Sequence, residues 1–397
     1  MNESGGMSIK ANGQVYKVFK RKDGVLSTIV YDYKQDKRIY VYSKDVIKLK
    51  QKIEQTFNNI VLGINKEDEA NELFENYASS YLLIFKYGKI KQSSFDSLEN
   101  MLFRHVFPRI GKFRLRDISA TMLQCLINDI AKNHARSTCR RVYDTFAPIF
   151  KYAHASGIIS INPAALIVLP REEYMVKQSK DIRPYSVEEI ARLKQTIIDL
   201  YEQKHFYRIA PIFIFLANTG LRIGEALALS CEDVNLDERY VRIKHNLVRV
   251  KERNADGSTN NTTHYEVMGP KSKSSKRIVE LNTNAYWALK EILRRYEIDQ
   301  VPDNENFFFR TKDGDSYSQS TIRIMLQRIC VRADVEYKGL HNFRHYFATR
   351  LLYSNSDVNI VTISELLGHS DCSITQQVYL HAVNEEKRHA VELLEMI

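Results

Sequence analysis

The sequence lacks the features of several specialised protein classes. It has only 15 Gly and 8 Pro among 397 residues, whereas 11% of its residues are aromatic and 44% are hydrophobic. This composition excludes a collagen-like or disordered chain and indicates a buried core, with a length that suits two or three domains. The longest apolar stretch, Ala210 to Leu221, is interrupted by Asn218 and is too short to span a bilayer. No apolar signal-peptide core follows Met1. We therefore expect a soluble intracellular protein without a membrane partner.

Cysteine and the common enzyme signatures give no support to several other classes. The five cysteines are widely spaced and contain no C-x-x-C pair, which argues against a disulfide framework or a cysteine-rich zinc site and fits a reducing cytosol. The sequence has no G-x-x-x-x-G-K-[ST], G-x-G-x-x-G, G-x-S-x-G or H-E-x-x-H. Nucleotide hydrolysis, dinucleotide redox chemistry and ordinary serine hydrolysis therefore lack support.

Positive charge is what the chain has in excess. Its 58 Lys and Arg against 48 Asp and Glu give a net charge of +10, which favours a polyanionic partner such as nucleic acid. Residues 1–52 alone hold twelve Lys and Arg against five Asp and Glu. Strand-like runs at 14–20, 26–34 and 38–42, with a following helix capped at Ser43, predict a small sheet plus a helix. Basic residues interleaved with aromatic ones favour DNA contact over a merely solvated surface, and the candidates are Lys17, Lys20 and Arg21.

Helical periodicity dominates from Leu73 to about Leu166. We expect a break between helices at 108–111. Asn162-Pro163 is expected to end the last helix, because the residue before proline is pushed out of the helical region. A charged stretch at 171–183 indicates a linker, and Ser186 with Glu189 predicts a capping box that begins a third unit. The helical part also carries basic residues that either solvate a helix or contact DNA, namely Arg136, Arg140 and Arg141.

The third unit contains a spaced series of cationic, imidazole and hydroxyl side chains. An apolar run leads into Thr219-Gly220-Leu221-Arg222-Ile223-Gly224-Glu225, in which Glu225 is placed to orient the Arg222 guanidinium and the glycines permit close backbone approach. A predicted hairpin, with strands at 240–250 and 266–268, leads to a Lys/Ser-rich turn at 271–277 and a strand at 278–281. Further on, three features follow in order: His341 with Arg344 at a predicted helix start, Leu366-Leu367-Gly368-His369-Ser370, and Tyr379.

Taken singly, each of these features has an ordinary structural explanation. An Arg–Glu pair is usually a surface ion pair, a Lys/Ser-rich turn is usually solvated, and one tyrosine among 23 usually packs. His341 and His345 could suggest a zinc pair, but no third ligand is arranged near them. The order of the features and their local contexts together indicate something more specific.

Taken together, these features resemble the catalytic boxes of the tyrosine recombinases, or phage-type integrases, and in particular the integrases of conjugative transposons. The matching residues are Thr-Gly-Leu-Arg-Ile-Gly-Glu, His-Asn-Phe-Arg-His, Leu-Leu-Gly-His-Ser and the late Tyr379, with Gly111, Asp117-Ile118 and Asn162-Pro163 in the helical part. The resemblance implies a multidomain α+β fold. Its expected parts are a small N-terminal β-sheet arm-binding domain (1–70), an all-α core-binding domain (71–170), the linker (171–183), and a mainly α catalytic domain with a small antiparallel sheet and a C-terminal tail (184–397).

The resemblance also implies the chemistry. Guanidinium forks suit the negative charge that builds up on the non-bridging oxygens of an attacked phosphodiester. Tyr379 is implied as the nucleophile that forms a 3′-phosphotyrosyl link. Lys273 is implied as the general acid for the leaving 5′ oxygen, with Lys271 as the alternative. The other implied roles are phosphate binding by Arg222, Arg344 and His369, proton transfer assisted by His341, and support by Glu225. Bond energy stays in the phosphotyrosine, so no ATP, metal or other cofactor is required.

We therefore expect a bacterial, cytoplasmic and nucleoid-associated enzyme that integrates and excises a mobile element. Its expected partners are double-stranded DNA at core-type and arm-type sites, further copies of itself in a tetramer, and an excision accessory protein. Two alternatives stay open: a type IB topoisomerase-like enzyme that relaxes DNA as a monomer, and a catalytically inactive DNA-binding regulator. The separate basic N-terminal segment and the late tyrosine favour recombination, and the filled catalytic positions argue against the regulator. An apolar stripe within 386–397 predicts a tail that packs on a neighbouring protomer or on its own core.

Overall fold

The computed structural model describes most of the chain and divides it into two compact units, residues 1–179 and 180–397. The described residues are 7–33, 36–62, 66–175, 184–254, 257–259, 261–269, 276–302, 306–354 and 359–368. None of the helices within these ranges is long and apolar enough to cross a bilayer.

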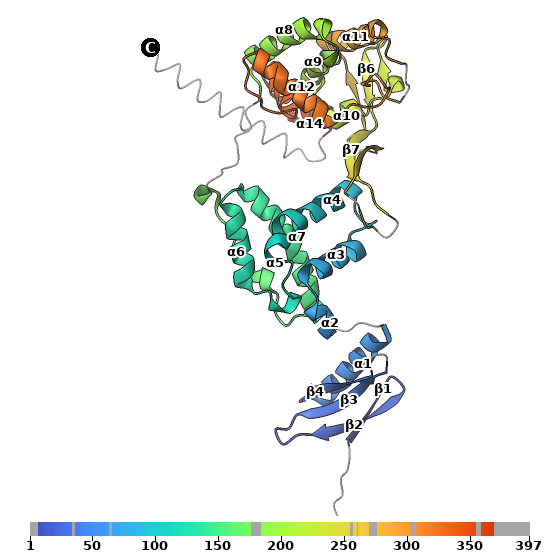
Figure 1. Ribbon diagram of the computed structural model, residues 1–397, viewed down its shortest axis with the longest axis vertical. Coiled ribbons are helices and arrows are strands. Elements are labelled where there is room, and N and C mark those ends of the chain that lie inside the picture. The colour runs from blue at the N-terminus through green and yellow to red at the C-terminus, as the bar shows by residue number, and fades with distance from the viewer. Residues whose placement is uncertain are drawn as a thin grey trace, which may run out of the picture. The chain divides into compact units, whose positions relative to one another are not determined.

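The first unit begins with a four-stranded antiparallel sheet in the order β1-β2-β3-β4, followed by helix α1 (Figure 1). The strands are Met7–Ala11, Gln14–Lys20, Leu26–Asp32 and Lys37–Ser43, and α1 is Val46–Leu62. The sequence patterns predicted β2, β3, β4 and the helix but missed β1. The signal was present, because Asn12-Gly13 joins β1 to β2 with positive φ at both residues, as a two-residue hairpin turn requires.

The sheet has one buried and one exposed face. Inward-pointing residues alternate along β3 and pack with Leu49 and Ile53 of α1, which are fully buried. The outer face instead leaves large aromatic side chains exposed, and basic residues lie among them. The exposed aromatic residues of β2, β3 and β4 are Phe19, Tyr31, Tyr40 and Tyr42.

A helical core follows the sheet in the same unit. Its helices are α2 (Lys66–Asn71), α3 (Phe74–Phe85), α4 (Gln92–Met101), a π-helical turn (Leu102–Val106), α5 (Phe107–Ile110), α6 (Ala120–Ala131) and α7 (Arg136–Ala155). They surround a buried aromatic centre, in which Phe74 stacks on Phe150 with ring centroids 4.9 Å apart. This core shares no buried residue with the core of the sheet.

The two predicted helix ends have different outcomes. The chain does leave the helix within 108–111, but at Gly111 and not at Pro108, because Pro108 lies in the first turn of α5 and the helix continues to Ile110. The prediction for Asn162 was wrong, because Asn162 does not end the last helix. That helix, α7, ends at Ala155 ahead of Gly157, whose φ is +72°. The side chain of Asn162 instead accepts a hydrogen bond from the Ala164 N–H, 3.1 Å away, and caps a short 3₁₀ turn.

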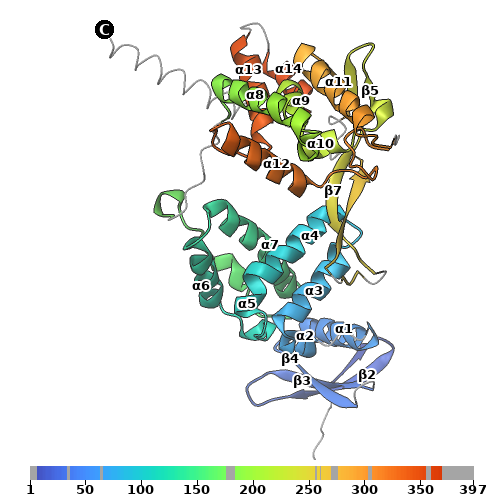
Figure 2. The same ribbon diagram turned by 45° about the horizontal axis from the view of Figure 1, so that its top comes forward.

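The second unit is mainly helical with small antiparallel sheets. Its helices are α8 (Val187–Gln203), α9 (Ile212–Thr219), α10 (Ile223–Leu227), α11 (Thr283–Ile298), α12 (Gln319–Arg332), α13 (Asn342–Ser354) and α14 (Ile360–Leu367). The predicted capping box at Ser186 and Glu189 begins α8. Seven of the eight residues of α9 are buried, and α9 packs against α11 and α13, so it forms the centre of this unit (Figure 2).

The hairpin predicted in this unit is present, but only the second part of its first strand takes part in it. The run at 240–250 is two strands, β6 (Tyr240–Ile243) and β7 (Asn246–Lys251). β6 joins β5 (Val234–Asn235) and β9 (Arg277–Glu280), whereas β7 forms a separate ribbon with β8 (Thr263–Met268). At the break, Lys244 Nζ lies 2.6 Å from the buried carboxylate of Asp233.

Candidate active site

The predicted Arg222–Glu225 pair exists and has a defined geometry. Arg222 is the N-cap of α10, and Glu225 accepts hydrogen bonds from the Arg222 backbone N–H at 3.0 Å and from its Nη1 at 2.7 Å. The Glu225 side chain is only 5% exposed, whereas that of Arg222 is 36% exposed. A buried carboxylate therefore orients a guanidinium that is still open to solvent.

Two glycines on either side of Arg222 allow this arrangement. Gly220 ends α9 in the left-handed conformation, with φ at +65°, and a Cβ there would collide with the ring of Phe347. A Cβ on Gly224 would lie 2.9 Å from the carbonyl oxygen of Leu247 and would also meet the Asn246 side chain. The close backbone approach predicted from the sequence is therefore present at both positions.

A second arginine, which sequence reasoning did not single out as a site residue, shares the same carboxylate. Arg277, the first residue of β9, donates from Nη2 to Glu225 Oε2 at 3.0 Å and from Nε to the carbonyl oxygen of Leu366 at 2.7 Å. Its side chain is 7% exposed. The sequence did contain one indication of this role, because Arg277 is a cation placed between the Lys/Ser-rich turn and a strand of alternating pattern.

The charges around Glu225 keep it ionised. Burial alone would raise the pKa of its carboxyl group, but the charges and hydrogen bonds of Arg277 and Arg222 outweigh burial and hold the pKa below its ordinary value. The site therefore contains a fixed negative charge between two positive ones.

Arg344 lies deeper than Arg222. It belongs to α13, and its Nη1 and Nη2 donate to the carbonyl oxygens of Gly220, at 3.0 Å, and Leu367. Among the described residues its Nε is buried without a hydrogen-bond partner. Burial and the nearby charge of Arg222 lower the pKa of Arg344 to about 9, which still leaves the guanidinium protonated at neutral pH. This buried charge has one donor that its protein neighbours do not use.

His341 joins the same group one turn before Arg344. The residue keeps an exposed face, but the surrounding protein desolvates its ring. The charges of His345, Arg344 and Arg222 add to the effect of desolvation, so the pKa of His341 falls to about 4. His341 is therefore neutral at pH 7 in the free protein. The rings of His341 and His345 meet edge to face, 4.8 Å apart. No third side chain joins them into a metal-ligand group in the part of the chain that the structure describes.

The structure thus brings together Arg222, Glu225, His341 and Arg344 from the predicted set, and adds Arg277. The cations outnumber the single carboxylate, so the group favours an anion, and planar guanidinium donors suit the oxygens of a phosphate. Four predicted residues lie outside the described part of the chain: Lys271, Lys273, His369 and Tyr379. The predicted apolar tail lies outside it as well.

The six candidate DNA-contact residues fall into two groups. Lys17, Lys20 and Arg21 are exposed on the N-terminal sheet, and the guanidinium of Arg21 lies 4.6 Å from the centre of the Tyr42 ring. The three arginines of α7 already have protein partners: Arg136 donates to the Pro170 carbonyl, Arg140 to Asp144 and Arg141 to Ser97. The sheet residues are therefore the freer of the two groups to contact a ligand.

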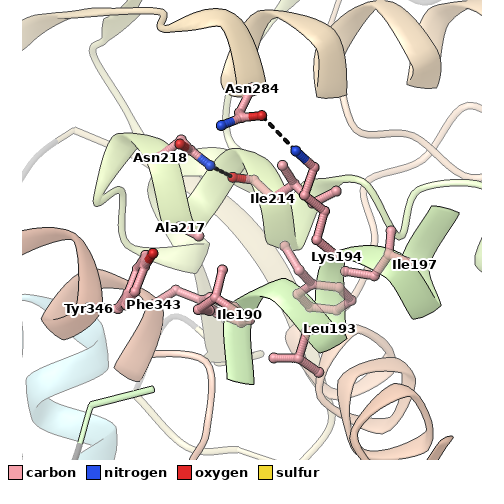
Figure 3. Close-up of a pocket in the computed structure, with 11 residues that line it drawn as sticks. Ile190, Leu193, Lys194, Ile197, Ile214, Ala217, Asn218, Asn284, Phe343 and Tyr346 are labelled. Carbon is pink, nitrogen blue, oxygen red and sulfur yellow. Dashed lines mark hydrogen bonds between the residues drawn. The ribbon is translucent and has the colours of Figure 1, made fainter. Parts of the chain in front are cut away.

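A small hollow lies beside the candidate site but contains none of its residues. It has a volume of about 80 Å³, and its lining comes mostly from apolar residues of α8, α9 and α13 (Figure 3). At its edge Lys194 Nζ donates to Asn284 Oδ1 at 2.8 Å. Phe343 and Tyr346 line it from α13, the helix that also carries Arg344.

Comparison with known proteins identifies the family. Residues 185–386 match the phage integrase family, and residues 74–168 match the phage integrase central domain. The XerC-like tyrosine recombinase of Caldanaerobacter subterraneus subsp. tengcongensis is 28% identical over 290 residues, which cover 70% of this chain and 71% of the relative. The prophage ps2 probable integrase of Lactococcus lactis subsp. lactis is 26% identical over 358 residues, or 87% and 89% of the two chains.

Solved structures confirm the predicted fold class. The Tn1549 transposon integrase, in complex with a circular intermediate DNA, superposes with a TM-score of 0.59 at 19% identity and covers 81% of this chain and 99% of its own. A lambda integrase tetramer bound to a Holliday junction gives a TM-score of 0.55 at 14% identity, with 91% and 94% coverage. With its catalytic and central segments both matched, this chain belongs to the phage integrase family, the tyrosine recombinases that cleave and rejoin DNA strands.

Proposed function

We propose that this protein is a site-specific integrase that inserts and excises a mobile element through a 3′-phosphotyrosyl intermediate. The observation that carries the proposal is the convergence of Arg222 and Arg344 with the neutral imidazole of His341, from segments far apart in the sequence, around one buried carboxylate. Such a group neutralises a phosphate that gains charge during attack.

The two arginines have different tasks in this proposal. The exposed guanidinium of Arg222 approaches the scissile phosphate from the protein surface, held in direction by Glu225. Arg344 supplies the Nε donor that its backbone partners leave unused among the described residues. His341, neutral before DNA binds, donates one hydrogen bond to a phosphate oxygen. These donors are fixed before the substrate arrives, so little reorganisation is needed in the transition state.

Tyr379 and Lys273 complete the reaction in our proposal. The Tyr379 oxygen forms a bond to phosphorus as its hydroxyl proton passes to the neutral imidazole of His341. The bond from phosphorus to the 5′ oxygen breaks, and Lys273 gives a proton to that oxygen. The products are a 3′-phosphotyrosine and a free 5′-hydroxyl. A 5′-hydroxyl of a second strand then reverses the step, and His369 contributes a further hydrogen bond to the phosphate. Energy conserved in the phosphotyrosine removes the need for ATP.

We further propose that different parts of the chain read different DNA sites. Residues 1–70 would bind arm-type sites through the exposed sheet face, residues 71–170 would bind the core site, and 184–397 would carry out catalysis after the linker at 171–183. On the exposed face of the N-terminal sheet, aromatic residues lie among basic ones, and the Arg21 guanidinium lies over the Tyr42 ring. Base edges and phosphates together offer matching partners for such a surface.

Strand exchange between two duplexes requires several copies of the enzyme. We infer a tetramer on DNA, as in the lambda integrase complex with a Holliday junction, and an accessory protein that favours excision. The bacterial relatives support action on the nucleoid in the cytoplasm.

A library of duplexes with a randomised, nicked centre tests the proposal. The wild-type protein should form adducts that survive denaturation, and sequencing of the captured DNA should give one core site. Tyr379→Phe should bind the same DNA without forming an adduct, because only the nucleophilic hydroxyl is removed. An adduct that persists in Tyr379→Phe would assign the nucleophile to another tyrosine. Wild-type protein that binds DNA but forms no adduct would support the inactive regulator.

Recombination between two duplexes separates the integrase from a topoisomerase-like enzyme. Two labelled duplexes that carry the captured site should yield recombinant products with the wild-type protein. Relaxation of supercoiled DNA without any recombinant product would favour the type IB alternative.

A further inference from the structure

We propose that Arg277 is a positioning residue that fixes the phosphate-binding arginine and the end of α14 in one arrangement. This inference rests on the proposed function, because it assigns a task within that site. Arg277 is not itself one of the expected catalytic residues. Its guanidinium instead joins Glu225 of α10 to the last turn of α14.

The hydrogen bonds of Arg277 explain how Arg222 stays available to the substrate. Glu225 presents two oxygens, and Arg277 Nη2 donates to Oε2 at 3.0 Å from the buried side. Arg222 Nη1 donates to Oε1 at 2.7 Å from the exposed side. Among the described residues the Arg222 guanidinium donates only through this Nη1. Its other donors can therefore face a phosphate. Without Arg277, the buried carboxylate would draw Arg222 inward to replace the lost charge.

The other contact of Arg277 holds the end of a helix. The last carbonyl groups of a helix have no partner within it. In α14, Arg277 Nε donates to the Leu366 carbonyl at 2.7 Å, and Arg344 donates to the Leu367 carbonyl. Gly368 then leaves the helix in the left-handed conformation, with φ at +64°, and the sequence continues into His369. Two cations thus hold the end of α14, from which the chain continues to His369. Cations are also favourable at the C-terminus of a helix, where the helix dipole is negative.

Lysine could not make these contacts equally well. The Arg277 fork serves a carboxylate with Nη2 and a carbonyl with Nε, in two directions at once, from a side chain that is 7% exposed. A lysine at this position offers a compact point charge without that planar spread. Charge alone is therefore not enough, and the geometry of the guanidinium is the property to test.

The test compares Arg277→Gln and Arg277→Lys with the wild-type full chain on the core site captured from the duplex library. At saturating DNA, Arg277→Gln should slow single-turnover cleavage by about 10²-fold, because small displacements of positioned groups cost that much. DNA affinity, measured in a Tyr379→Phe background, should change far less than the rate. Arg277→Lys should give an intermediate rate.

A neutral substrate separates positioning from general damage to the fold. A methylphosphonate at the scissile position removes one negative charge, so the arginines that neutralise it matter less. The difference between wild type and Arg277→Gln should then shrink to within about tenfold. Arg295→Gln is the matched control, because Arg295 is similarly buried at 11% exposure and pairs with the buried Asp299, outside the site. It should leave the cleavage rate at saturation unchanged.

A measurement without DNA keeps the inference independent of the proposed function. Hydrogen exchange in α14 should be faster in Arg277→Gln than in wild type, and unchanged in Arg295→Gln. Unaltered exchange in α14, wild-type cleavage by Arg277→Gln, or a loss that persists in full on the methylphosphonate would each overturn the inference. A wild-type protein that forms no adduct would overturn the proposed function, and the exchange measurement would then decide the placement of Arg277 by itself.

Discussion

At the scale of single residues, the site consists of buried charges that hold one exposed charge in place. Arg222 is the accessible member, and Glu225, Arg277 and Arg344 lie behind it at 7% exposure or less. Buried charges are costly unless they are paired and hydrogen-bonded, and each of these three has at least two such bonds. The hydrogen bonds offset the cost of burying these charges and hold Arg222 in a fixed orientation.

The neutral state of His341 predicts a pH response. Its pKa in the folded protein is about 4, below the ordinary 6.5, so the unfolded chain binds more protons between these values. Stability contributed by this histidine is present above pH 6.5 and is lost as the pH falls toward 4. Histidine NMR signals, assigned with His341→Gln, should show a midpoint near 4 in the free protein. Binding of DNA should move that midpoint upward, because phosphate charge favours the imidazolium. A midpoint near 6.5 in free protein would contradict the crowded environment described above.

Lys273 is predicted to be the general acid that protonates the leaving 5′ oxygen. Lys273→Ala should slow cleavage by about 10²-fold or more. Replacement of the bridging 5′ oxygen by sulfur, a better leaving group, should restore much of that rate. The same substrate should not rescue Arg277→Gln, because Arg277 does not protonate the leaving group. If Lys271→Ala shows the sulfur rescue and Lys273→Ala does not, then the acid is Lys271.

At the scale of elements, the turn between α9 and α10 determines where Arg222 lies. α9 is buried along nearly its whole length and cannot shift without disturbing the core of the second unit. Gly220 ends α9 in the left-handed conformation, and only Leu221 and the N-cap Arg222 separate it from α10. The carbonyl of Gly220 accepts the hydrogen bond from Arg344 Nη1, so the turn connects both arginines.

Gly220→Ala tests the importance of this turn. The substitution places a Cβ at a φ of +65° and against the Phe347 ring. We expect a loss of at least about 1 kcal/mol in the free energy of unfolding, from strain and overpacking together. Gly88→Ala is a suitable control, since φ there is +68° but no atom lies within 4 Å of the added Cβ. Thermal unfolding should show the larger loss at Gly220, and cleavage should fall only there. Equal losses at both positions would mean that packing against Phe347 does not matter.

At the scale of the whole molecule, the chain contains separate cores. The sheet with α1 has its own buried cluster, the helices α3 to α7 have another, and the second unit has two more. No buried residue belongs to two of these clusters. Separate cores agree with the proposal that parts of one chain bind different DNA sites.

Deletion of residues 1–65 tests this independence. The cut falls between α1 and α2, so the three remaining clusters keep all their described members. The shortened protein should still cleave the core site but lose binding to a second class of site. The DNA affinity of the shortened protein should also depend less steeply on salt concentration, because phosphate contacts are lost. Binding assays at several salt concentrations would measure both effects. Unchanged affinity for every DNA would show that the basic sheet serves solubility alone.

The sequence by itself determined whatever depends on near neighbours along the chain. Alternation identified three of the strands, and the pattern around Arg222 gave its hydrogen bonds to Glu225, because those groups lie within one helical turn. The order of the boxes also indicated the family. Each of these signals is local or linear, and none needs knowledge of how distant segments pack.

Only the tertiary structure decided which distant groups meet. Arg277 lies far from both Glu225 and Leu366 in the sequence, and its contacts follow from where β9 and α14 pack around α10. The split of 240–250 into β6 and β7 likewise appears only in the fold, where the two strands pair with different partner strands. A buried ion pair forms only where the fold removes both partners from water, and spacing along the chain carries no record of that.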